Sequence, residues 1–153
     1  MRDMEVIYRG SSEGMRLIEE HVGLTLRALD AYNHWEVEPL LESLDRGVEW
    51  RPAIPMLLGG EATVYRGHAG VRRLFREIRD SFAEIRIEFS AIRGVGDRVV
   101  AVGHMRARGL ASGAETETPW AFLAELRQGK GFRIQTYLDP DEAMDAAELD
   151  AVN

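Results

Sequence analysis

Gly67-His68-Ala69-Gly70 is a stretch of the chain whose residue types could do chemistry. It joins the β-like run "ATVYR" to a run with helical periodicity, where a glycine-rich loop can bind an anion or present a catalytic histidine. The same residues are typical of a plain joint, in which a glycine turns the backbone and the histidine begins the helix. We favour the joint, because glycines beside helix starts are common.

The cysteine and histidine content of the sequence argues against metal and thiol chemistry. The sequence has no cysteine, which excludes disulfides, thiolate nucleophiles, zinc fingers and iron–sulfur clusters. The histidines are scattered singly, with no pair at the spacing of metal ligands: His21, His34, His68 and His104. We therefore expect neither a metal site nor a cofactor.

Charge and hydropathy exclude several classes of partner. The formal net charge is −7, so a phosphate backbone is repelled unless basic residues gather on one face. Four arginines lie between residues 72 and 79, but Glu77 and Asp80 are interspersed with them, as on a solvated helix face. The N-terminus has no signal-like apolar core, and no apolar run approaches membrane-spanning length. We expect a cytoplasmic protein that binds neither nucleic acid nor a membrane.

The periodicity of the apolar residues predicts an α+β fold. Helical spacing recurs near 18–32 and 35–45, and most clearly from His68 to about Ala83. The sequences "GVEWRP" and "ATVYR" predict a short hairpin before that long helix. From residue 85 the period changes to two, which predicts a four-stranded antiparallel meander that ends with "FRIQTYLD" and is followed by a helical tail.

The chain is predicted to be a single domain with short ends. Its 153 residues are enough to bury a sizeable core, and no internal repeat or linker divides them. We expect a loose leader over residues 1–14, the domain over 15–145 and a tail over 146–153.

The order of elements, with "VEWRP" before "YRGHAGVRRLFREI" and "RIQTYLD" on the last strand, resembles the nuclear transport factor 2-like superfamily. Within it, residues 15 to about 145 look most like the SnoaL-type polyketide cyclase and ketosteroid isomerase branch. The resemblance implies a cone-shaped fold, in which a strongly curved antiparallel sheet wraps around helices and leaves an apolar pocket at its open end. It also implies a homodimer formed through the sheet.

Two kinds of active site in the superfamily lack their key residues in this chain. Ketosteroid isomerases use an aspartate base with tyrosine and aspartate donors, and these positions fall at Trp50, near Leu26 and near Phe122. All three residues are apolar, so isomerase activity by that mechanism is not expected. Limonene-epoxide-hydrolase-like members carry an Arg-x-Asp pair, and its nearest counterpart, His104-x-Arg106-x-Arg108, has no carboxylate.

Asp139 matches the acid/base aspartate that SnoaL-like cyclases carry on the last strand. In a dry pocket such a carboxylate moves a proton to or from a carbon beside a carbonyl group. The run Asp139-Pro140-Asp141-Glu142 is also typical of a helix start, with an N-cap, a proline at the first helical position and a capping glutamate. Both interpretations stay open, since one carboxylate can serve both purposes.

His104 and Tyr137 are the hydrogen-bond partners that the resemblance offers Asp139. The family's histidine position falls near Ala107, so His104 would be a substitute. His104 shares a strand face with Val100, and the opposite face is smaller and apolar; if the small face packs on the helices, His104 points to solvent or a dimer partner, and otherwise it lines the pocket. Tyr137 lies on the polar face of the last strand, which faces water on a half-buried strand but can line the cavity of a cone.

Four aromatic residues are the expected pocket walls, although a plain core would use the same residues: Trp50, Tyr65, Trp120 and Phe122. The sequence thus predicts a small-molecule pocket for an apolar, ring-containing ligand. It leaves open whether Asp139, with His104 or Tyr137, catalyses a proton transfer of the cyclase or isomerase kind. The alternative is a non-catalytic binding or assembly module that kept the fold and lost the catalytic residues.

Overall fold

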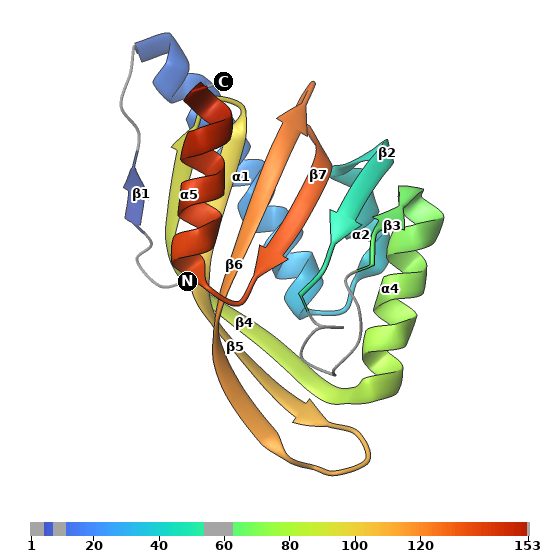
Figure 1. The fold of residues 1–153 in the computed structure, drawn as a ribbon. Helices are drawn as coiled ribbons and strands as arrows, with labels where there is room; N and C mark the ends of the chain where they lie inside the picture. The colour runs from blue at the N-terminus through green and yellow to red at the C-terminus, as the bar shows by residue number, and fades with distance from the viewer. Residues whose placement is uncertain (1–4, 8–11, 54–62, 153) are drawn as a thin grey trace.

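A seven-stranded, curved and unclosed sheet organises the chain, whose computed structural model describes residues 5–7, 12–53 and 63–152 (Figure 1). Four consecutive strands form the antiparallel meander expected from the period of two: β4 (Phe82–Val95), β5 (Arg98–Gly109), β6 (Glu115–Arg127) and β7 (Lys130–Tyr137). The predicted hairpin is β2 (Leu44–Arg51) with β3 (Tyr65–Arg66), and β2 joins the sheet beside β7 in parallel. The prediction of an α+β fold with a curved sheet is confirmed.

The opposite edge of the sheet holds a strand that the sequence did not indicate. β1 (Glu5–Ile7) lies within the expected leader and runs parallel to β4, with Val6 paired to Ile92. A strand of 3 residues has too little length to show a period of its own. It exists because β4 offers it an edge to pair with.

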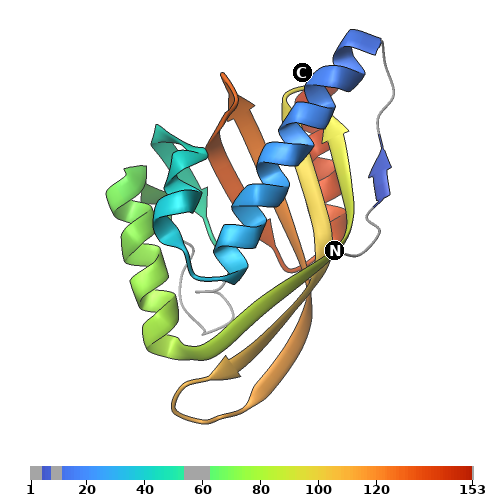
Figure 2. The same cartoon turned by 180° about the vertical axis from the view of Figure 1, so that it is seen from behind.

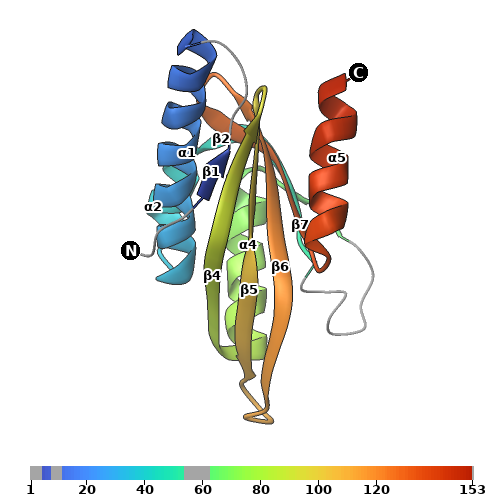
Figure 3. The same cartoon turned by 90° about the vertical axis from the view of Figure 1, so that its left-hand side faces the viewer.

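The helices cover the two faces of the sheet unequally. α1 (Ser12–Asn33), α2 (Val37–Glu42) and α4 (Gly67–Ser81) lie on one face, here called the inner face (Figure 2). α5 (Pro140–Val152) lies on the opposite, outer face (Figure 3). None of the described helices combines the length and the apolar content that a membrane span requires.

The alternation of residues along β5 shows which side of the sheet is inside. Val99, Ala101 and Met105 are buried against the inner core, as the smaller and apolar face of the strand. Val100, on the other face, belongs to a separate small cluster with Ala121 and the α5 alanines Ala143 and Ala147. The main core therefore lies between the sheet and α1, α2 and α4, and α5 covers a second, thinner apolar layer.

The long helix α4 follows directly from its sequence pattern. Its apolar stripe is buried and comprises Val71, Leu74, Phe75 and Ile78. Strand β3 leads straight into it through Gly67, whose φ of +69° is a left-handed conformation that glycine adopts without strain. A ring nitrogen of His68 lies 3.0 Å from the backbone oxygen of Leu44, which anchors the start of α4 to β2. The prediction that this stretch is a strand-to-helix joint is confirmed.

Candidate functional site

An apolar cavity of about 50 Å³ lies between α1, α2 and the inner faces of β2, β6 and β7. Its described lining is mostly aliphatic and aromatic: Leu24, Thr25, Ala28, Leu29, Tyr32, Leu40, Ser43, Leu44, Trp50, Phe122, Ala124, Leu126, Gly129, Gly131 and Ile134. No Asp, Glu, His, Lys or Arg is among these residues. The cavity therefore brings no charged acid or base to a ligand from the part of the chain described.

The few polar side chains in the lining differ in whether they already have a partner. The hydroxyl of Thr25 donates to the backbone oxygen of His21 at 2.8 Å, and that of Ser43 donates to the backbone oxygen of Leu40 at 2.6 Å. Within the described residues, the hydroxyl of Tyr32 and the indole N–H of Trp50 make no hydrogen bond. Two donors are thus left for an acceptor that the protein itself does not supply.

Tyr32 stands at the centre of the aromatic part of the core. Its ring stacks on Trp50 with centroids 6.2 Å apart, and meets the edges of Phe75 and Phe122 at 5.4 and 5.6 Å. Burial raises the pKa of the Tyr32 hydroxyl well above its ordinary value, because the phenolate would lose its hydration. At neutral pH this hydroxyl is therefore a proton-bearing group that can donate a hydrogen bond.

The four predicted wall residues separate into two groups. Trp50 and Phe122 line the cavity. Trp120 is fully buried and packs on Phe122 with centroids 6.3 Å apart, and its indole N–H has no partner in the described structure. Tyr65 is buried between β3 and α4, where its hydroxyl donates to Glu77, and burial together with that hydrogen bond raises the pKa of Tyr65 to about 12.

The three predicted catalytic residues do not lie at the cavity. Asp139 is exposed beyond the end of β7, where its carboxylate accepts a hydrogen bond from the backbone N–H of Asp141 at 2.9 Å. His104 is exposed on the outer face of β5, between Glu88 of β4 and Pro119 of β6. Tyr137 is half-buried on the outer face, against the small cluster under α5. The structure therefore places none of the three beside the Tyr32–Trp50 donors.

Comparison with known protein families decides where the chain belongs. A family model described as "SnoaL-like domain" matches residues 25–134, which run from the C-terminal part of α1 through α2, α4 and β2 to β6 and into β7. The chain belongs to the SnoaL-like domain family. A search of curated proteins finds no match to it.

Solved structures agree with this SnoaL-like fold. An NTF2-like protein of unknown function from Burkholderia pseudomallei has a TM-score of 0.72 at 18% identity, over 82% of this chain and 95% of that one. TerC, co-crystallised with polyporic acid, has a TM-score of 0.71 at 21% identity, over 84% and 98%. A putative SnoaL-like polyketide cyclase from Jannaschia sp. has a TM-score of 0.69 at 15% identity, over 92% and 97%. At these identities the likeness concerns the fold alone.

Asp139 of this SnoaL-like domain is expected to act on stability and not on ligand binding. Its carboxylate and backbone oxygen both accept hydrogen bonds from the first turn of α5, as an N-cap does. We expect Asp139→Ala to lower the free energy of unfolding by about 1 kcal/mol. Asp139→Asn keeps a capping oxygen and should stay close to the wild-type value in urea denaturation. Equal losses in both variants would contradict the capping role.

Tyr32 is the residue that sequence reasoning missed. The resemblance places the family's tyrosine position near Leu26, and the helical spacing of the first helix makes Tyr32 one of its apolar positions. Its helical spacing shows that it faces the core, but spacing cannot show that a cavity touches its ring.

Among the described residues there is no group of three or more His, Asp or Glu side chains placed to hold a metal ion.

Proposed function

We propose that this SnoaL-like domain binds a small, apolar, ring-containing molecule that carries a hydrogen-bond acceptor such as a carbonyl oxygen. The observation that carries the proposal is the apolar cavity whose two unpartnered polar groups, on Tyr32 and Trp50, can both donate to one acceptor. A ligand that takes these groups out of water gains affinity if it supplies an acceptor to them, because a polar group that loses its water partner without a replacement is costly. A ligand that brings only a donor can use the Tyr32 oxygen and leaves the indole N–H of Trp50 without a partner.

The proposal is binding without catalysis. A general base must come within hydrogen-bond reach of the proton that it removes. In the described lining there is no carboxylate or imidazole, and Asp139 and His104 are exposed elsewhere. TerC, a protein of similar fold, was crystallised with polyporic acid, which supports a ligand-binding role for such a fold without indicating the ligand of this chain.

The size of the cavity determines how a ligand would enter. A volume of about 50 Å³ has room for a few water molecules and not for a ring system. Leu24 of α1 and Gly129 of the β6–β7 turn both line it, so separation of the helix from this turn would widen it. We therefore expect single-ring ligands to bind more readily than steroids or aromatic polyketides.

Thermal unfolding with matched ligands tests the proposal. Acetophenone presents a ring and a carbonyl oxygen, whereas ethylbenzene has nearly the same shape and no acceptor. A ligand at about a hundred times its dissociation constant should add roughly 2.7 kcal/mol of stability, a shift of several degrees. We expect a larger shift with acetophenone than with ethylbenzene at equal concentration.

The Tyr32→Phe variant tests the donor directly. Loss of one neutral hydrogen bond should weaken acetophenone binding about fivefold, while ethylbenzene binding stays unchanged. Tyr65→Phe is the matched control, because it removes a hydroxyl that already donates to Glu77 away from the cavity. Equal effects of the two substitutions, or equal stabilisation by the two ligands, would argue against the donor role. A flat response to these ligands, steroids, polyketides and terpenoids would favour the assembly module.

The homodimer expected from the family resemblance stays a prediction. On the outer face, α5 already covers the apolar side chains of Val100, Ala121 and Leu123. A dimer through this face would therefore use the polar remainder of the sheet or displace α5.

A further inference from the structure

A second hollow, of about 210 Å³, lies on the outer face of the sheet, on the side opposite the cavity. Four neighbouring strands supply its polar lining: Arg51, Arg98, Glu125, Arg133, Gln135 and Tyr137. Three arginines face one glutamate there, although the chain as a whole has a net charge of −7. The charges of Arg98 and Arg133 are partly offset by ion pairs with Asp97, Glu125 and Glu49, so among the described residues the unpaired positive charge of the hollow lies at Arg51.

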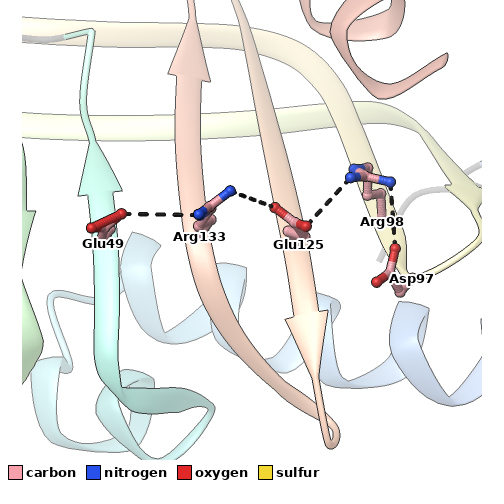
Figure 4. Close-up of polar contacts among 5 residues, drawn as sticks. All are labelled: Glu49, Asp97, Arg98, Glu125 and Arg133. Atoms are coloured by element: carbon pink, nitrogen blue, oxygen red, sulfur yellow. Dashed lines mark hydrogen bonds and ion pairs between the residues drawn. The ribbon is translucent and has the colours of Figure 1, made fainter. Parts of the chain in front are cut away.

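A row of alternating charges crosses the sheet along one rim of this hollow (Figure 4). Three links join direct cross-strand neighbours: Arg98 with Glu125, Glu125 with Arg133, and Arg133 with Glu49. A further link joins Arg98 to its sequence neighbour Asp97 at 3.5 Å. The pair of Arg98 and Glu125 is the tightest, at 3.3 Å, and its side chains are only 16% and 20% exposed. This pair fixes one end of the row, because its partly buried side chains have little freedom to move.

The other end of the row is loosely held. Arg133 is 59% exposed, and its ion pairs with Glu125 and Glu49 measure 3.8 and 4.0 Å. Arg51 lies one row further along β2, exposed, and makes no ion pair or hydrogen bond with any described residue. Gln135, its cross-strand neighbour, likewise has a side-chain amide without a partner in the described part of the chain. The guanidinium groups of Arg51 and Arg133 and the amide of Gln135 therefore lie together and have N–H groups that can donate to a ligand.

We propose that this hollow binds the carboxylate group of a small organic anion. A guanidinium group offers two parallel N–H donors that match a carboxylate, and Arg51 and Arg133 flank the amide of Gln135. A carboxylate fits better than a phosphate, because a dianion would be repelled by Glu125 and Glu49 beside the site. The half-buried ring of Tyr137 gives the apolar part of such a ligand a surface to contact. This site does not depend on the proposed function of the inner cavity.

The test is an NMR titration of the ¹⁵N-labelled full chain with benzoate. We expect saturable shifts of the Gln135 side-chain amide and of backbone signals in β2 and β7. Benzamide, which has the same ring and no charge, should produce no saturable shift. Inorganic phosphate should bind more weakly than benzoate.

Arginine variants distinguish specific binding of benzoate in the hollow from non-specific electrostatic attraction of anions to the protein. Arg51→Gln and Arg133→Gln should each weaken benzoate binding about tenfold, because each removes a charge-assisted contact. The control is Arg86→Gln, which makes the same charge change on β4 at a residue that does not line this hollow. Circular dichroism and thermal unfolding check that each variant is folded. The proposal is overturned if benzoate causes no saturable shift up to its solubility limit, if benzamide binds equally well, or if Arg86→Gln weakens binding as much as Arg51→Gln.

Discussion

The Gly103→Ala variant is expected to lose about 3 kcal/mol of unfolding free energy, a large effect for one added methyl group. Gly103 lies in β5 opposite Phe89, beside the irregularity in β4 between Phe89 and Ala91. A Cβ atom there would lie 1.9 Å from the backbone oxygen of Glu88 and 2.7 Å from the Cα of Phe89. Because both atoms belong to the backbone, no side-chain rotation relieves the overlap, and β4 must move. Urea denaturation measures the loss.

Gly23→Ala is the control for this substitution. Gly23 lies inside α1, where the nearest atom to an added Cβ is the end of the flexible Arg27 side chain at 3.9 Å. Alanine in a helix interior is more favourable than glycine, so this variant should gain roughly 0.5–1 kcal/mol. A Gly103→Ala protein as stable as the wild type would show that β4 and β5 lie further apart than in the structure described above.

Phe122→Ala is the second large effect, with an expected loss of about 3–5 kcal/mol. The Phe122 ring contacts four other aromatic rings, with centroids between 5.6 and 6.3 Å away: Tyr32, Trp50, Phe89 and Trp120. The ring also lines the apolar cavity, so its removal enlarges that cavity. We therefore expect ethylbenzene to restore part of the lost stability in thermal unfolding.

Leu110→Ala is the matched control for an apolar truncation. Leu110 is 57% exposed beyond the end of β5, so its replacement should change stability by less than about 0.5 kcal/mol, with no rescue by ethylbenzene. If Phe122→Ala were as mild as this control, the aromatic cluster would not hold the core together. If it were destabilising without ligand rescue, the space vacated would not be continuous with the cavity.

The sequence was sufficient to predict the helices and strands whose apolar residues recur at a regular spacing. The apolar stripe of α4 and the alternation of the meander are local patterns, and the joint at Gly67-His68 follows from the backbone freedom of glycine. The face of the sheet that meets the helices could not be predicted. A period of two separates the faces of β5, but it cannot say whether the face with Val99 or the face with His104 meets the helices.

The site depends on contacts between distant parts of the chain. Tyr32 on α1, Trp50 on β2 and Phe122 on β6 meet only after folding, and no local spacing predicts that a cavity remains beside them. The position of α5 on the outer face could not be predicted from the sequence either. Its pattern of small and acidic residues indicates a helix, but it does not indicate which surface that helix covers. The expected catalytic role of Asp139 came from its place on the last strand, whereas its geometry is that of a helix cap.

The most direct test of the account uses the indole N–H groups of the three tryptophans. In a ¹⁵N-labelled sample their NMR signals can be assigned with a Trp50→Phe variant and followed during an acetophenone titration. The account predicts that the Trp50 signal moves downfield and saturates, because its free N–H gains a carbonyl acceptor, while the signal of Trp35, which lies outside the cavity lining beside Arg79, stays in place. A Trp50 signal that does not move, or that moves equally with ethylbenzene, would contradict the proposed binding of an acceptor-bearing ligand.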